Sequence, residues 1–365
     1  MKSNILYTLI VITIIFISCE EERTRPEFPK NNNLSSELPT MSPAKQGFNT
    51  VELASALNAA SSFLNLKSLL IIRNGYIVTE EYYNEYTQDS IHRVSSVTKS
   101  VVSALIGKAI EEGYITSEND SIYKYVEPLG YTFSEEKKAI TIKHILTMTS
   151  GLKWNDQSSE NYNAWYNADD KVQFILDLPI EKKPGEVWNY NTPPIHLLSV
   201  IITETTGMST LAYADESLFG PLGIIEREWY QVDDYYYGGS YLYLRARDMA
   251  KLGMLFVNEG ISGNEEIVSW DWIERTLKIT IAQNTGWFWG NISEGNYGYL
   301  WWQDTGRIHA SFFALGYGGQ LIYCVPALDL VVVTTATYNQ YTDIAAQEND
   351  LIGLVVNYIV PSLIN

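Results

Sequence analysis

The sequence feature that most constrains the fold is a lysine at the start of an apolar helical segment. The stretch RVSSVTKS, residues 93 to 100, leads directly into VVSALIGKAI. Helical spacing of three residues puts Lys99 on the same face as Ser96, and the aliphatic continuation predicts a buried helix. The Lys99 amine is therefore expected to lie out of bulk water, where burial lowers the pKa of a lysine.

The Ser-x-x-Lys spacing by itself is weak evidence, because it occurs five times in this chain. The context of Ser96 is distinctive, since a helix start is followed there by an apolar run. The other four pairs lie in polar or turn-like segments, where a lysine is expected to be solvated and protonated. They are Ser42/Lys45, Ser121/Lys124, Ser134/Lys137 and Ser150/Lys153.

A helix that begins at Ser96 would supply free N–H groups and positive potential at the serine hydroxyl. Together with a lysine of lowered pKa, this is the Ser-Lys form of an activated nucleophile. The alternative is an ordinary helix start, in which Ser96 caps the helix and Lys99 extends to the surface.

Length and charge narrow the class of protein. With 365 residues, 46% of them hydrophobic, the chain can bury a large core as one sizeable domain or two interleaved ones. The formal net charge of -18 opposes binding to nucleic acid and to anionic lipid surfaces. A globular protein without nucleic-acid partners is predicted.

The N-terminus is typical of an exported protein. MKSNILYTLIVITIIFISC has one lysine, an apolar run from Ile5 to Ile17, then Ser18 and Cys19. The run is shorter than a membrane span requires, and a cysteine after a small residue is similar to a bacterial lipoprotein cleavage site. We predict a lipoprotein signal peptide at residues 1–18 and lipidation of Cys19, which anchors the protein in the bacterial cell envelope, periplasmic or on the cell surface. An uncleaved anchor or ordinary secretory cleavage nearby is the alternative.

The segments after the leader differ in pattern. Residues 19–45 are polar and rich in Pro, Asn and Ser, which predicts a flexible tether. A helical pattern over 51–64 precedes two strand-like runs around Asn74-Gly75, a strong hairpin signal. Helical patterns then dominate, and the last quarter returns to strands before a final helix. These late segments are the strand-like runs 297–304, 311–326 and 329–337 and the helix Ile344 to Ile359.

Strands near both ends of the chain with helices between them predict an α+β fold. We expect an antiparallel sheet built from both chain ends, flanked by helices, with an inserted helical region. The α/β region is assigned to residues 46–92 and 281–365. The helix-rich region that carries the nucleophile is assigned to residues 93–280.

Other chemistries lack their sequence signatures. Gly-x-Ser-x-Gly and His-Glu-x-x-His do not occur, and the four histidines are scattered without metal-ligand spacing. GYGGQ is not followed by the Lys-Ser/Thr of a phosphate loop. Cys324 alternates with apolar residues and is expected to fill the core. No metal or cofactor is predicted.

Residues 93–100 resemble the nucleophile motif of the serine β-lactamase and penicillin-binding-protein family. The chain is similar to its class C-like branch, which holds class C β-lactamases, D-Ala-D-Ala carboxypeptidases, family esterases and 6-aminohexanoate-dimer hydrolases. The resemblance implies the β-lactamase/transpeptidase-like fold. From about residue 50 onward, it is carried by ITIKHILTMTSGL (140–152), PGEVWNYNTPPIHLLSVIITETTG (184–207), LRARDMAKLG (244–253), YGYLWW (297–302) and ALGYGGQLIYCVP (314–326).

The resemblance implies roles for matching residues. Ser96 matches the nucleophile and Lys99 its lysine. Tyr190 matches the tyrosine of a Tyr-x-Asn motif, which completes the general base and later protonates the leaving group. The third residue of that motif is Thr192 here, and the expected substrate contacts are Thr192 and the neighbouring Asn191. The alternative for Tyr190 is simple packing at the rim, as one of 26 tyrosines.

The third family motif, Lys-Thr-Gly, corresponds to Ala314-Leu315-Gly316 and keeps only its glycine. The resemblance implies that Gly316 and Gly318 let the substrate approach the strand, and that the backbone N–H groups of Ser96 and Tyr317 form an oxyanion hole. Loss of the lysine removes a cation that holds a substrate carboxylate. His309, expected at a surface turn, could supply only a pH-dependent charge. These departures favour less anionic substrates.

The sequence therefore predicts a lipid-tethered serine hydrolase that cleaves a small-molecule or short peptide-like ester or amide through an acyl-enzyme on Ser96. A true β-lactamase or D-Ala-D-Ala carboxypeptidase is the alternative within this class. From another class, the alternative is an acylatable sensor or binding module without turnover. Fast nitrocefin turnover with poor ester turnover favours the first alternative, and a persistent adduct on Ser96 favours the second.

Overall fold

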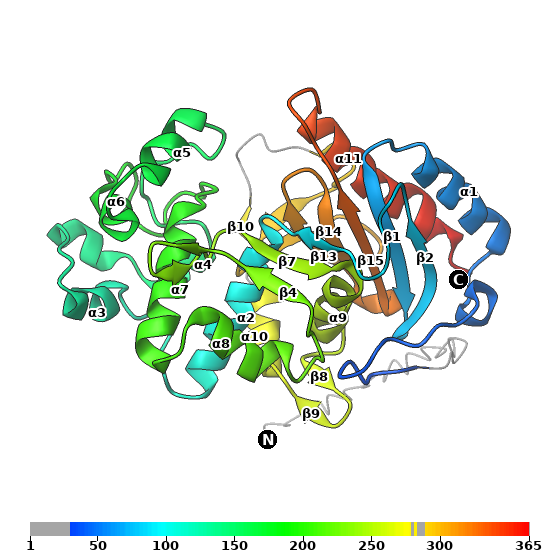
Figure 1. Cartoon of the computed structure of the whole chain (residues 1–365), viewed down its shortest axis with the longest axis horizontal. Coiled ribbons are helices and arrows are strands. Elements are labelled where there is room, and N and C mark those ends of the chain that lie inside the picture. Colours follow the sequence, from blue (N-terminus) through cyan, green and yellow to red (C-terminus); the bar gives the residue numbers. More distant parts are fainter. Residues whose placement is uncertain (1–29, 279–280, 283–288, 365) are drawn as a thin grey trace, which may run out of the picture.

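The computed structural model describes residues 30–278, 281–282 and 289–364, and a single large antiparallel sheet forms its centre (Figure 1). The strand order is β10-β11-β12-β13-β14-β15-β1-β2. Leu69 of β1 lies opposite Thr334 of β15, so the predicted sheet built from both chain ends is confirmed. The strands are β1 (Leu66–Arg73), β2 (Tyr76–Tyr82), β10 (Ile281–Ala282), β11 (Gly295–Tyr297), β12 (Trp302–Asp304), β13 (Ser311–Gly316), β14 (Gln320–Val325) and β15 (Leu330–Ala336).

The hairpin between β1 and β2 forms where the sequence predicts it. Asn74 and Gly75 have φ angles of 51° and 75°. Two consecutive left-handed residues match the twist of the flanking strands, and Asn-Gly tolerates this conformation best. The β1–β2 pairing continues from Arg73 opposite Tyr76 toward the far end of both strands.

Helices cover both faces of the sheet (Figure 1). On one face lie α1 (Thr50–Ser61) and α11 (Ile344–Leu354), which contact each other. On the other face, α9 (Ala246–Val257) packs against β14, β15 and β1, and α2 (Val97–Glu111) packs against β13 and β14. A π-helical turn at Val355–Ile359 extends α11, so the predicted final helix is confirmed.

The segment between β2 and β10 contains most of the remaining helices and several short strands, and its larger helical part lies to one side of the sheet (Figure 1). Within the stretch 93–280, α9 packs directly on the main sheet. A second sheet in the order β3-β7-β4 also lies within it. These elements are β3 (Ile91–Arg93), α3 (Tyr123–Val126), α4 (Ile142–Leu146), α5 (Ser159–Tyr166), α6 (Lys171–Asp177), α7 (Pro193–Thr206), α8 (Thr210–Ala214), β4 (Arg227–Trp229), β5 (Gln231–Val232), β6 (Tyr235–Tyr236), β7 (Leu242–Arg245), β8 (Ile261–Ser262), β9 (Glu265–Glu266) and α10 (Trp270–Lys278).

The predicted tether is shorter than the sequence indicated. Leu34 and Leu38 are buried, and Thr40 forms a β-bridge with Ile77. The prediction of a flexible segment up to residue 45 is therefore wrong for the part that the structure describes. The physical reason is that a few apolar side chains, spaced among polar ones, reach the core although they show no regular period.

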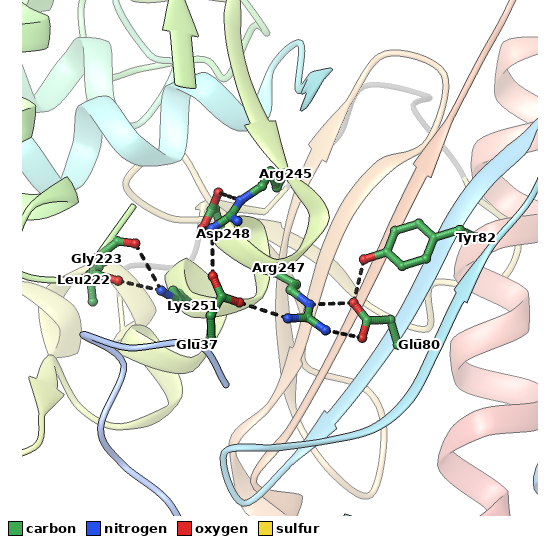
Figure 2. Close-up of polar contacts among 9 residues, drawn as sticks. All are labelled: Glu37, Glu80, Tyr82, Leu222, Gly223, Arg245, Arg247, Asp248 and Lys251. Atoms are coloured by element: carbon green, nitrogen blue, oxygen red, sulfur yellow. Dashed lines mark hydrogen bonds and ion pairs between the residues drawn. The ribbon is translucent and has the colours of Figure 1, made fainter. Parts of the chain in front are cut away.

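An ion-pair network fixes the same N-terminal segment (Figure 2). Glu37 pairs with Arg245 at 3.2 Å and with Arg247 at 3.0 Å. Arg247 continues to Glu80 of β2 at 2.6 Å, and Arg245 continues to the buried Asp248 at 2.8 Å. The network thereby joins the N-terminal segment, β2 and the start of α9.

Two sequence expectations about the cysteines have different outcomes. Cys324 lies buried in β14, as expected of a core residue. Cys19 and the leader lie outside the described residues. Within the part of the chain that the structure describes, no helix combines the length and apolar character needed to cross a membrane.

Candidate active site

Ser96 lies at the junction between β3 and α2. The preceding residue, Ser95, has a φ of 50°, a left-handed conformation that costs about 1–2 kcal/mol for a residue with a side chain. The Ser95 carbonyl accepts hydrogen bonds from the N–H and the hydroxyl of Thr98 at 3.1 and 2.7 Å, which holds this turn. The Ser96 side chain makes no cap hydrogen bond to α2, so the ordinary capping alternative is wrong.

Lys99 is buried beside Ser96, with only 1% of its surface exposed. Its Nζ donates hydrogen bonds to Ser96 Oγ at 2.7 Å and to the Gly239 carbonyl at 2.9 Å. Burial lowers the pKa of Lys99 to about 8, while the charge of Asp156 opposes that shift. The expected burial of this amine next to the serine hydroxyl is thereby confirmed.

Tyr190 precedes α7 and completes a group of three polar side chains. The Lys99 Nζ lies 5.1 Å from the centroid of the Tyr190 ring, and the phenol takes part in a hydrogen bond with Ser96. The ring stacks on Trp302 at 5.5 Å with an interplanar angle of 13°. Burial and the charge of Asp156 raise the pKa of Tyr190, so the phenol is neutral at rest. A neutral phenol can donate a proton or a hydrogen bond.

The end of β13 lies directly against the turn before α2. A Cβ added to Gly316 would lie 2.2 Å from the Val94 carbonyl oxygen and 3.1 Å from Ser95 Cβ, so only glycine fits there. This contact brings the backbone of the next residue, Tyr317, to the start of the helix that begins after Ser96. The expected oxyanion hole, formed by the N–H groups of Ser96 and Tyr317, stays a prediction.

A cavity of about 760 Å³ opens over these groups. Apart from Ser96 and Tyr190, its walls are mostly aromatic and hydroxyl-bearing, which suits a small organic substrate with a few polar groups. The other lining residues are Arg93, Ser95, Asp156, Gln157, Ser159, Tyr162, Tyr166, Thr192, Tyr237, Gly239, Ser240, Tyr241, Trp289, Trp302, Leu315, Tyr317, Tyr338, Ile344, Ala345 and Glu348.

The residues predicted to touch substrate divide into two groups. Thr192 lines the cavity, and its backbone N–H donates to Asp156 Oδ1 at 3.0 Å. Asn191 is buried and does not line the cavity, because its Nδ2 donates to the Leu152 carbonyl at 3.2 Å. Gly318 also lies outside the lining, and Gly316 acts through the close backbone approach described above rather than as part of the wall.

Two carboxylates in the cavity were missed by sequence reasoning. Asp156 Oδ1 accepts three hydrogen bonds of 3.0 Å, from Trp154 Nε1, the Tyr162 hydroxyl and the Thr192 N–H. Asp156 lies in a loop without periodicity, and no local signal in the sequence singles it out.

Glu348 projects from α11 into the same cavity. Its Oε1 accepts the Gly318 N–H at 3.0 Å and its Oε2 accepts Trp289 Nε1 at 3.2 Å. Burial raises the pKa of Glu348 to about 7, against the effect of these two hydrogen bonds. Glu348 thus holds the turn that follows Tyr317.

The remaining Ser-x-x-Lys pairs and the histidines lie elsewhere. Lys137 is buried although the sequence predicted a solvated lysine, because its Nζ reaches the Leu176 carbonyl; neither it nor Ser134 lines the cavity. Burial lowers the pKa of both His92 and His196 to about 4, so both are neutral. His309 lines a different cavity. Among the described residues, no group of His, Cys, Asp or Glu side chains is arranged to hold a metal ion.

The fold, with a serine and a buried lysine in contact beside a cavity, is of the kind found in β-lactamase-like serine hydrolases. A family model described as Beta-lactamase matches residues 67–357. The chain therefore belongs to the β-lactamase family, whose members are serine hydrolases. The resemblance in the sequence and the predicted β-lactamase/transpeptidase-like fold are both confirmed.

Individual relatives are distant. An uncharacterised protein of Alkalihalophilus pseudofirmus is 28% identical over 73% of this chain and 82% of its own length. A 6-aminohexanoate-dimer hydrolase of Paenarthrobacter ureafaciens is 22% identical over 74% of this chain and 72% of its own. The structure of EstCE1, a hydrolase with promiscuous acyltransferase activity, superposes with a TM-score of 0.68 at 15% identity, covering 85% of this chain and 100% of EstCE1. This last likeness shows a common fold.

Proposed function

We propose that the protein hydrolyses small ester or amide substrates through an acyl-enzyme on Ser96. The observation that carries this proposal is the 2.7 Å contact between the Lys99 amine and the Ser96 hydroxyl in a buried position at the mouth of a cavity. A lysine of lowered pKa exists partly as the free amine at neutral pH and can accept the serine proton.

The reaction follows from the arrangement of these groups. Ser96 Oγ transfers its proton to Lys99 and bonds to the substrate carbonyl carbon, and the C=O electron pair moves to oxygen. The N–H groups of Ser96 and Tyr317 stabilise that oxyanion. When it collapses, the bond to the leaving group breaks, and the proton passes through Lys99 and the neutral Tyr190 to the departing oxygen or nitrogen.

Deacylation repeats these steps with water as the nucleophile. Water loses a proton to the Lys99–Tyr190 pair and bonds to the acyl carbon. The ester bond to Ser96 Oγ then breaks, and Oγ recovers its proton. A small acid is released and the enzyme returns to its starting state. No metal or cofactor is needed to balance this sequence.

The test is activity-based labelling together with ester hydrolysis. We expect a fluorophosphonate probe to label the wild type on Ser96 and the Ser96→Ala variant to lose both labelling and turnover of nitrophenyl esters. Ser134→Ala is the matched control, because Ser134 also precedes a buried lysine by three residues but lies outside the cavity. Labelling that persists in Ser96→Ala would contradict the assignment.

Nitrocefin and intact-mass measurements separate the proposed activity from its alternatives. We expect slow nitrocefin turnover relative to esters, because Thr192 stands where the family's Tyr-x-Asn motif has the asparagine that contacts the β-lactam amide. Nitrocefin turnover faster than ester turnover would instead indicate a true β-lactamase. A burst followed by a lasting mass adduct on Ser96 would indicate a sensor without turnover.

We further propose that the protein is anchored to the bacterial cell envelope by lipid on Cys19. The support is the apolar run from Ile5 to Ile17 followed by Ser18 and Cys19. We expect the wild type in the membrane fraction and Cys19→Ser in the soluble envelope fraction. Equal membrane recovery of both forms would refute lipidation at this residue.

A further inference from the structure

One guanidinium in the cavity has no carboxylate partner among the described residues. Arg93, the last residue of β3, lines the cavity. Its Nε is buried without a hydrogen-bond partner, and no ion pair within the described part of the chain includes it. In a chain with a formal net charge of -18, a cation left without a carboxylate beside a cavity is unusual.

The surroundings hold this guanidinium while leaving most of its donors unused. The Arg93 Cζ lies 4.2 Å from the centroid of the Tyr241 ring, and Nη2 donates to Ser240 Oγ at 3.2 Å. An arginine has five N–H donors in a planar fork, and stacking on an aromatic face fixes the plane without using them. The hydroxyls of Tyr241 and Tyr166 lie 3.2 Å apart beside it.

The cation lies close to the reacting groups. The Gly239 carbonyl holds the Lys99 amine, and the next residue, Ser240, holds Arg93. Arg93 also precedes Ser96 by three residues along the chain. A ligand group bound by Arg93 would thus be a short distance from a carbonyl placed at the Ser96 hydroxyl.

The two carboxylates of the cavity are directed to other donors. Asp156 Oδ1 accepts three hydrogen bonds from Trp154, Tyr162 and Thr192. Both oxygens of Glu348 accept one N–H each. Neither carboxylate forms an ion pair with Arg93, so the positive charge remains available to a ligand.

We propose that Arg93, together with the Ser240 hydroxyl, binds a carboxylate of the substrate. This inference rests on the proposed hydrolase function and narrows its substrate class to esters or amides that carry an anionic group near the scissile bond. It revises the sequence expectation of less anionic substrates: the cation missing from the strand beside the nucleophile is provided from β3. Arginine suits this role because its fork can bind a carboxylate through two parallel hydrogen bonds.

The test compares anionic and neutral esters that share the same carbon skeleton. One arm places the carboxylate on the acyl side, with 4-nitrophenyl hydrogen glutarate against 4-nitrophenyl valerate. A second arm places it on the leaving group, with 4-acetoxybenzoate against 4-acetoxybenzamide. The quantity measured is the ratio of kcat/KM for the anionic ester to that for its neutral partner. This ratio cancels any general loss of activity in a variant.

We expect Arg93→Gln to lower this ratio at least tenfold in one arm, through a higher KM for the anionic ester. Arg93→Lys should recover part of the ratio, because it keeps the charge but loses the two-point contact. Lys45→Gln removes one positive charge from an exposed residue outside the cavity and should leave the ratio unchanged. Equal ratios in wild type and Arg93→Gln in both arms would overturn the proposal.

A binding measurement on the wild type separates this proposal from the proposed function. Calorimetry with glutarate and with neutral glutaramide should show tighter binding of glutarate, weakened by salt. Absence of ester turnover with preserved glutarate binding refutes the hydrolase function and retains the anion site. Ester turnover through Ser96 without tighter binding of glutarate refutes the anion site and retains the hydrolase function. If Arg93→Gln fails to fold, the calorimetric comparison on the wild type still tests the anion site.

Discussion

The pKa of Lys99 predicts how the activity depends on pH. Burial lowers this pKa from 10.5 to about 8. At pH 7 the free-amine fraction is then about one in ten, against roughly one in 3,000 for an unperturbed lysine. Burial therefore raises the population of the competent base about 300-fold, at a free-energy cost to the charged form of about 3 kcal/mol.

The kcat/KM for a neutral ester should accordingly rise with pH and level off above about 8, because this constant reports groups of the free enzyme. Asp156 raises the pKa of Lys99, so Asp156→Asn should move the rising limb to lower pH. The asparagine keeps an oxygen to accept the hydrogen bonds that Asp156 Oδ1 now receives. Asp89→Asn, at an exposed residue outside the cavity, is the matched control and should leave the limb in place.

The assay is initial-rate hydrolysis of 4-nitrophenyl valerate between about pH 5.5 and 10, with the Ser96→Ala rate subtracted at each pH. A profile of kcat/KM against pH whose rising limb lies near the ordinary lysine pKa would refute the argument that burial prepares Lys99 as the base. So would a limb that moves to higher pH in Asp156→Asn, since removal of a negative charge cannot favour the protonated amine.

Three further predictions concern single residues. Lys99→Met should abolish hydrolysis yet stabilise the fold in urea at pH 7 by up to about 3 kcal/mol, because below pH 8 the wild type keeps a buried charge; a less stable variant contradicts this. Gly316→Ala should lower kcat/KM at least about 100-fold, since its Cβ would lie 2.2 Å from the Val94 carbonyl oxygen; near-normal turnover would show that the end of β13 is not critical. The pKa of Glu348 is raised from 4.5 to about 7, so the folded state holds this proton more tightly than the unfolded state. Stability contributed by that proton is present below about pH 4.5 and lost as pH rises through 7. Glu348→Gln does not titrate and replaces one acceptor oxygen with an NH2 donor, which adds a cost that does not change with pH. The stability of the variant relative to wild type should therefore increase by up to about 3 kcal/mol between pH 5 and 8; a constant difference across that range speaks against it.

Local patterns in the sequence were sufficient for several parts of the site. The three-residue spacing at an apolar helix start predicted the contact between Ser96 and Lys99, because helix geometry alone fixes that relation. The Asn74-Gly75 hairpin followed from backbone preferences in the same way. Each of these features depends only on residues close together in the chain.

Features that depend on tertiary packing were not predictable in this way. Asp156 and Glu348 come from a loop and a late helix, and nothing near them in the sequence indicates that they share a cavity. Asn191 was expected to face substrate, but packing turns its amide toward the Leu152 carbonyl. In each case, contacts with residues distant in the sequence decide on which side of the backbone the polar side chain lies.

The pairing of β1 with β15 has a consequence for how the chain folds. Each strand pairs with residues from the opposite end of the described sequence, so closing the sheet carries a large loop-entropy cost and raises the contact order. A nascent chain that has not yet released β15 leaves β1 and β14 with open edges, which are prone to pair with other chains. We expect refolding from denaturant to be slow and to yield more soluble protein at low chain concentration.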